Sequence, residues 1–180
     1  PGWGWLIEIC TTRNSPLATV ASDFENIHVM TITREDDFGN RATRDWIKKV
    51  LKKHPGTSVH GSLPCTAWCP RQAMNRAQLG PEYCKEHDRR MKESKEWVSA
   101  FIEIAELALD LGGSISFEWP RASHGWTKNN SLIEFIKRNN LYEGLPAGCF
   151  FGMKNDKGEL IKKEWRFVCS NKRVADNLST

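Results

Sequence analysis

Apolar residues recur along the chain with two alternating periods, one typical of strands and one typical of helices. Short apolar or every-second-residue runs predict four strands, at residues 5–10, 27–33, 57–63 and 114–118. Apolar residues at helical spacing predict four helices, at residues 16–24, 43–53, 88–111 and 131–138. Two more strands, at 149–153 and 164–170, flank a strong turn at 155–158. This order predicts an α/β fold: a three-layer α/β/α, mostly parallel sheet that ends in an antiparallel hairpin.

The segment from residue 65 to residue 87 shows neither period. It contains Pro70, Gly80 and Pro81, which interrupt regular elements. We therefore expect a single domain over residues 1–180 with an irregular insertion at about 65–87. An irregular segment of that length is usually functional or held in place by a ligand.

The predicted strands make one edge of the sheet the expected ligand site. Ligands of open α/β sheets bind beyond the carboxyl ends of the strands. Four short segments follow the strands at that edge: residues 10–13, 33–36, 64–66 and 118–120.

Composition and charge change this picture only slightly. The net charge of +4 permits contact with nucleic acid. No apolar run reaches the roughly 20 residues that span a bilayer, and no signal-peptide pattern opens the chain, so we expect no membrane partner. The six cysteines lack the pattern of a secreted disulfide scaffold, so we expect reduced thiols in a cytoplasmic or nuclear, that is intracellular, compartment. The chain starts with Pro1, and we expect it to be a piece of a larger polyprotein with other domains.

Two short motifs carry a resemblance to a known family. Pro64-Cys65 follows the third predicted strand, and Phe117-Glu118 ends the fourth. In this order the chain resembles the Rossmann-like S-adenosylmethionine-dependent methyltransferases, and most closely the DNA cytosine-C5 methyltransferases. The resemblance implies that Cys65 is the nucleophile that attacks the base, Glu118 the carboxyl that holds it, and Arg166 a basic residue near it. The Pro-Cys-Thr-x-Trp pattern is also similar to segments of retroelement-encoded and viral reading frames, which implies an origin in a mobile element or virus.

The resemblance also implies a cofactor site. S-adenosylmethionine would be bound by Thr11, Thr12, Glu35 and Pro64, with Glu35 on the ribose. The family has a glycine-rich loop after its first strand, whereas residues 10–16 of this chain contain no glycine. The family also has Asn after its glutamate, where this chain has Trp119. These departures leave two versions open: an active enzyme, and a domain that keeps the fold and binds nucleic acid after losing catalysis.

The same segment also has the spacing of a zinc site. Cys65 and Cys69 are separated by fourteen residues from Cys84 and His87, which would complete a Cys3His set. Zinc would make the chain a metal-stabilised module for binding nucleic acid or protein, without enzymatic activity. Metal at Cys65 and catalysis by Cys65 exclude each other, because a coordinated thiolate is not free to attack.

Two smaller expectations concern histidine and tryptophan. A thiol enzyme that pairs Cys65 with His60 or His124 is a third alternative. Three tryptophans lie in predicted strand-end loops, where a base could stack: Trp68, Trp119 and Trp126. Three others are expected in the core: Trp46, Trp97 and Trp165.

Overall fold

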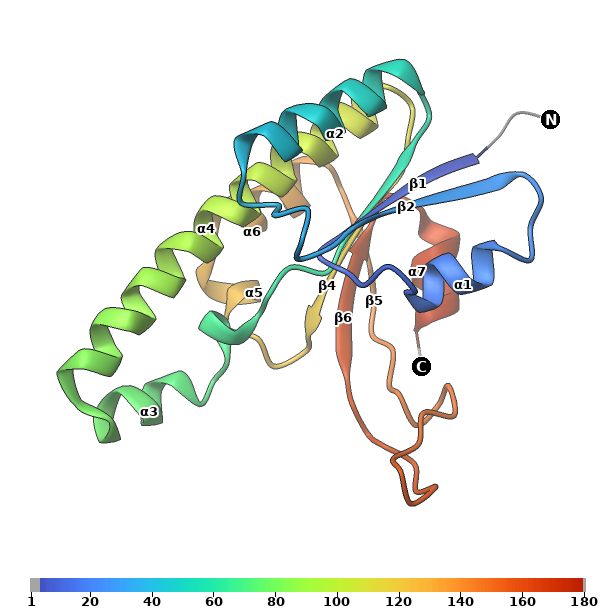
Figure 1. The fold of residues 1–180 in the computed structure, drawn as a ribbon. Coiled ribbons are helices and arrows are strands. Elements are labelled where there is room, and N and C mark those ends of the chain that lie inside the picture. The colour runs from blue at the N-terminus through green and yellow to red at the C-terminus, as the bar shows by residue number, and fades with distance from the viewer. Residues whose placement is uncertain (1–3, 180) are drawn as a thin grey trace. The chain divides into compact units, whose positions relative to one another are not determined.

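The computed structural model describes residues 4–179, and six strands within this range form one mixed sheet (Figure 1). The strands are β1 (Gly4–Ile9), β2 (Ile27–Ile32), β3 (Ser58–Gly61), β4 (Ile115–Pro120), β5 (Tyr142–Gly144) and β6 (Trp165–Cys169). Their order in the sheet is β2-β1-β3-β4-β6-β5. The pairs β1–β2, β1–β3 and β3–β4 are parallel, and β5–β6 is antiparallel. The α/β class and the mostly parallel sheet with an antiparallel C-terminal pair are therefore confirmed.

The helices of the described range are α1 (Pro16–Ala21), α2 (Arg41–Lys53), η1 (Thr66–Trp68, a 3-10 turn), α3 (Gln72–Gln78), α4 (Gly80–Asp110), α5 (Gly125–Lys128), α6 (Asn130–Arg138) and α7 (Lys172–Leu178). Side-chain caps fix where several of them begin. Ser15 caps α1, with Pro16 at its first position, and Asn40 and Asn129 cap α2 and α6 through their side chains.

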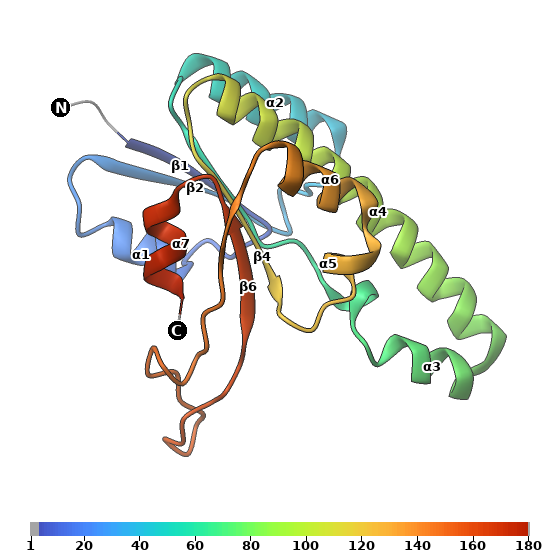
Figure 2. The same ribbon diagram turned by 180° about the vertical axis from the view of Figure 1, so that it is seen from behind.

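The chain divides into two compact units. Unit 1 contains residues 4–63 and 97–117, and unit 2 contains residues 64–96 and 118–179. In unit 1, α2 lies beside the last part of α4, and the strands separate this pair from α1 (Figures 1 and 2). Lys48 of α2 bonds to Glu103 of α4. The core of this unit includes Ile7, Ile47 and Phe101, all fully buried.

Unit 2 contains η1, α3, the first part of α4, α5, α6, β5, β6 and α7. Helix α7 lies beside β5 and β6, as both views show (Figures 1 and 2). Their close approach depends on Gly144, because a Cβ at that position would lie 2.9 Å from the Cβ of Leu178.

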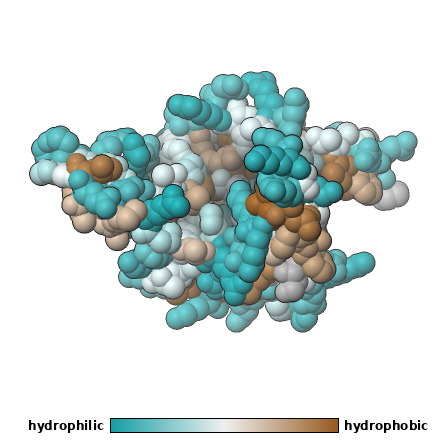
Figure 3. All heavy atoms as spheres, turned by 90° about the horizontal axis from the view of Figure 1, so that it is seen from below, coloured by the Kyte–Doolittle hydropathy of each residue, from teal (hydrophilic) through white to brown (hydrophobic). Residues whose placement is uncertain are grey.

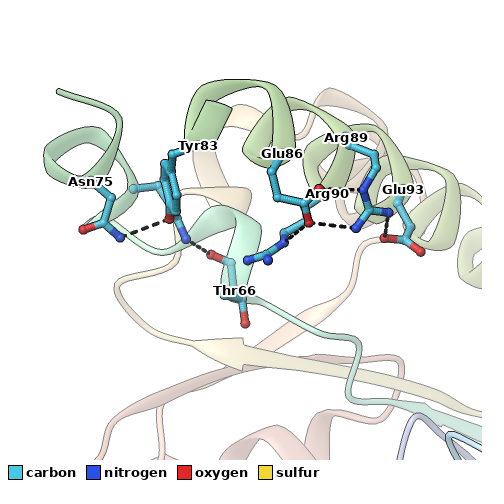
Figure 4. A network of polar contacts seen from close by, with 8 residues as sticks. Thr66, Asn75, Tyr83, Glu86, Arg89, Arg90 and Glu93 are labelled. Atoms are coloured by element: carbon cyan, nitrogen blue, oxygen red, sulfur yellow. Dashed lines mark hydrogen bonds and ion pairs between the residues drawn. The ribbon is translucent and has the colours of Figure 1, made fainter. Parts of the chain in front are cut away.

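The expected irregular insertion at 65–87 is wrong, because most of it is helical. The first part of α4 has no apolar stripe, so its sequence lacks the hydrophobic period from which a helix is predicted. Ion pairs at helical spacing stabilise it instead: Arg89 and Arg90 both bind Glu86, and Arg89 also reaches Glu93 (Figure 4).

The hairpin prediction needs correction in its first strand. Strand β6 pairs with β5 at Tyr142–Gly144 and not with residues 149–153. The predicted turn at 155–158 is present, because the Asn155 side chain accepts hydrogen bonds from the backbone N–H groups of Lys157 and Glu159. Helix α7 was not predicted.

None of the helices in the described range is both long and apolar enough to cross a membrane. The surface in Figure 3 shows hydrophobic side chains exposed among hydrophilic ones. The most exposed large apolar side chain is Phe150, at 70%.

Candidate functional site

Cys65 lies in a tight turn at the start of unit 2. It directly precedes η1, and its carbonyl accepts a hydrogen bond from the Trp68 N–H at 2.9 Å. Burial raises the pKa of the Cys65 thiol above its ordinary value. A backbone hydrogen bond lowers this pKa, the charge of Cys69 raises it, the charge of Lys163 lowers it, and the charge of Glu118 raises it. The charges of Glu118 and Lys163 thus both act on the Cys65 thiol, in opposite directions.

Glu118 reaches this group because β4 alternates. Phe117 and Trp119 point to one face and are fully buried, so Glu118 points to the other face and is half-buried. The pairing of Cys65 with Glu118 as catalytic residues stays a prediction.

Lys163 is a site residue that the sequence analysis missed. It lies in the segment before β6, and its Nζ sits 4.6 Å from the centroid of the Trp165 ring. No motif marks it, because a single lysine in a stretch that also contains Lys162 carries no pattern.

A hydrogen-bond relay fixes the turn that carries Cys65 (Figure 4). The Gln72 side chain donates to the Thr66 carbonyl at 2.8 Å and accepts from the Tyr83 hydroxyl at 2.5 Å. Asn75 in turn donates to the Tyr83 hydroxyl. Helices α3 and α4 thus hold η1 from one side, which limits how far Cys65 can move.

Arg166, expected near the target base, contacts Glu143 and Trp126. Its guanidinium bonds to Glu143 on the neighbouring strand β5 at 2.5 Å and lies 4.8 Å from the centroid of the Trp126 ring. The cation that acts on Cys65 is Lys163.

The four expected zinc ligands do not form a cluster. The two ring nitrogens of His87 bond to the Ala67 carbonyl and to Arg76, both at 3.0 Å, and the Cys84 thiol donates to the Arg76 carbonyl. Within residues 4–179, no three His, Cys, Asp or Glu side chains are grouped so that they could hold a metal ion. The zinc site stays a prediction for elemental analysis to test.

A small basic cavity lies next to η1 in unit 2. It measures about 200 Å3 and is lined partly by Trp68, Cys69, Arg76, His124 and Lys128. The expected site residue His124 is thus in the neighbourhood of the Cys65 turn. His60 is elsewhere, buried in unit 1 with its Nδ1 2.8 Å from the Ser116 hydroxyl.

The expected cofactor residues Thr11 and Thr12 follow β1 in unit 1. The preceding residue, Cys10, has a left-handed backbone with φ of 63°, a conformation that favours glycine. The buried Glu8 carboxylate holds this loop by accepting hydrogen bonds from the hydroxyls of Thr11 and Ser15. The loop thus makes a glycine-type turn without a glycine.

Glu35 lies after β2 in the same unit. Its carboxylate pairs with Arg13 at 3.2 Å and is mostly exposed. Asp36 accepts hydrogen bonds from the backbone and side chain of Thr33, and these bonds lower the pKa of the Asp36 carboxyl. The remaining expected cofactor residue, Pro64, is exposed at the start of unit 2.

Four of the six tryptophan expectations are wrong. Trp68, Trp119 and Trp126 are buried and pack against one another, with ring centroids about 6 Å apart, so they are not free to stack on a base. Trp46, expected in the core, is 46% exposed. The expected core residues Trp97 and Trp165 are half-buried.

No family model, curated protein or solved structure matches this chain.

Proposed function

We propose that the chain is a methyltransferase-like domain that acts on a base in nucleic acid. The observation that carries the proposal is that Cys65 follows β3 while Glu118 lies in the paired strand β4, directly after the Gly61–Phe117 pair, and that the charges of Glu118 and Lys163 both act on the Cys65 thiol. These are the group types that methylation at carbon 5 of cytosine requires: a thiol nucleophile, and a carboxyl that holds the ring while charge develops on it.

The proposed reaction assigns one role to each group. The Cys65 sulfur would add to carbon 6 of the ring, which makes carbon 5 nucleophilic. Carbon 5 would then take the methyl group from the sulfonium sulfur of S-adenosylmethionine, which leaves as S-adenosylhomocysteine. Glu118 holds the N3 edge meanwhile. The proton on carbon 5 then leaves to a base, the sulfur–carbon bond breaks, and the aromatic ring and the thiolate are restored. Lys163 favours the thiolate form, because its positive charge lowers the pKa of Cys65.

The edge of unit 1 supports S-adenosylmethionine as the methyl donor. The strand order reverses direction between β1 and β3, and ligands of open α/β sheets bind at such a reversal. The left-handed turn at Cys10 lets the backbone take the path for which a glycine loop is normally required. The exposed Glu35 carboxylate matches ribose hydroxyls, which are hydrogen-bond donors. Thr11 and Thr12 would line the same edge.

The test is methyl transfer with a labelled donor. The protein is incubated with S-adenosylmethionine carrying a trideuterated methyl group and with cytosine-containing DNA or RNA, and the digested nucleosides are analysed by mass spectrometry. We expect trideuteromethyl-cytosine from the wild type and from the control Cys149→Ala, and none from Cys65→Ala. An absence of labelled base, together with no heat of cofactor binding at millimolar concentration in calorimetry, would refute the proposal.

A further inference from the structure

Helix α2 concentrates positive charge. Its 13 residues include six basic side chains and only one acid, Asp45. Arg41 pairs with Asp45, and Lys48 pairs with Glu103. The other four basic residues have no ion pair within the described part of the chain: Arg44, Lys49, Lys52 and Lys53. The negative end of the helix dipole favours Lys52 and Lys53 in the last turn, but it does not compensate the whole charge.

One solvent-facing side of α2 combines this charge with an exposed aromatic ring. Trp46, Lys49 and Lys53 are three and four residues apart in turn, so they share one face of the helix. The residues that anchor the helix, Ile47 and Leu51, are fully buried on the opposite side. Trp46 therefore serves no purpose in the core of this unit, although an exposed tryptophan is unfavourable in water.

The same side of α2 leads to a cleft at the amino-terminal ends of β1 and β2. The cleft measures about 480 Å3 and is lined by Trp5, His28, Lys53, His54 and Pro55. The Trp5 ring stacks on His54 with centroids 4.4 Å apart and lies 4.9 Å from the centroid of His28. The cleft thus presents imidazole and ammonium groups on an aromatic floor.

We propose that this face of α2 and the adjoining cleft bind single-stranded nucleic acid. Proteins bind such strands by combining cations that follow the phosphates with aromatic rings on which bases stack. Lys49 and Lys53 supply the cations, Trp46 supplies an exposed ring, and the His54 imidazole in the cleft supplies a hydrogen-bond donor for phosphate oxygens. A membrane-binding helix needs a wide apolar face toward the lipid, whereas the apolar face of α2 is buried in the core. The surface goes beyond the proposed methyl transfer and does not use Cys65.

Fluorescence polarisation with labelled 15-residue oligo-dT and oligo-U tests this surface. The variants are the double substitution Lys49→Ala/Lys53→Ala and the single substitution Trp46→Ala. The matched control is Lys92→Ala/Lys95→Ala, which removes the same charge from two exposed lysines of α4. Circular dichroism checks that each variant is folded, and Cys65→Ser reports whether the nucleophile matters.

We expect salt-dependent binding by the wild type, the control and Cys65→Ser. The double variant should bind at least about tenfold more weakly, with a log–log salt slope smaller by about 1.4, since each lost phosphate contact removes about 0.7. Trp46→Ala should bind about fivefold or more weakly through the lost stacking. Equal binding by the double variant and its control, no binding by the wild type at low salt, or tighter binding to anionic phosphatidylserine vesicles than to either oligonucleotide would overturn the proposal. Loss of methyl transfer alone would leave it standing.

Discussion

At the scale of single residues, opposing effects set the reactivity of Cys65. Burial disfavours the thiolate and raises the pKa, and the nearby Cys69 and Glu118 act in the same direction. A backbone hydrogen bond and, to a lesser extent, the charge of Lys163 act against them. Because the effects that raise the pKa prevail, the free protein holds Cys65 mainly as a thiol at neutral pH. A substrate that brings Lys163 closer or neutralises Glu118 would therefore activate it.

Two substitutions should shift the reactivity of Cys65 in opposite directions. Lys163→Gln removes the charge that lowers the pKa of Cys65, so alkylation by iodoacetamide at pH 8 should slow by about threefold. Glu118→Gln removes a charge that raises this pKa, so alkylation should accelerate by a similar factor, about threefold. The rates are measured by mass spectrometry of the Cys65 peptide.

Arg166→Gln is the control for this pair of variants, because Arg166 is bound to Glu143. It removes one positive charge, as Lys163→Gln does, and should leave the rate unchanged. Identical rates in all three variants would mean that the thiol, the carboxyl and the ammonium do not act on one another.

At the scale of elements, the sequence predicts the helices and strands that bury an apolar face. It misses the helices that are held in place by polar contacts. The apolar periods place β1, β2, α2, β4 and α6 within a few residues of their bounds. They fail for α3 and the first part of α4, where ion pairs and the Gln72–Tyr83 bond replace an apolar stripe. They also fail for Trp46, because a helical tryptophan beside apolar neighbours fits the core pattern whether or not the ring is buried. In the site, the motifs indicate Cys65 and Glu118, but no local signal indicates Lys163.

The start of α5 offers a test of packing against helix propensity. A Cβ at Gly125 would lie 2.1 Å from the Trp119 ring, whereas alanine usually stabilises a helix by up to about 1 kcal/mol relative to glycine. The steric overlap with Trp119 should outweigh the gain in helix propensity. Gly125→Ala should therefore lower the free energy of unfolding by about 2 kcal/mol in urea denaturation. In Trp119→Leu the ring is gone, so adding Gly125→Ala should cost less than it does in the wild type. Equal costs in the two backgrounds would contradict the overlap.

At the scale of the whole molecule, α4 and β4 each run from one compact unit into the other. An isolated unit would therefore lose part of a helix and part of a strand. We expect the two units to unfold in one transition, so that a change in either unit alters the stability of both.

His60 lets pH report on this coupling. Burial in unit 1 lowers the pKa of His60 from 6.5 to about 4, so the unfolded chain binds a proton that the folded chain excludes. As pH falls below the unfolded value, the free energy of unfolding therefore decreases, by roughly 2 kcal/mol between pH 7.5 and pH 5. Asp36, whose pKa is lowered from 3.8, loses its contribution only at lower pH and does not affect this window. His60→Asn keeps a hydrogen-bonding group toward Ser116 but no longer titrates, so most of the dependence should disappear. Urea denaturation followed by tryptophan fluorescence, to which the buried Trp68, Trp119 and Trp126 of unit 2 contribute, should show the same decrease as circular dichroism. Different decreases by the two probes would show that the units unfold separately.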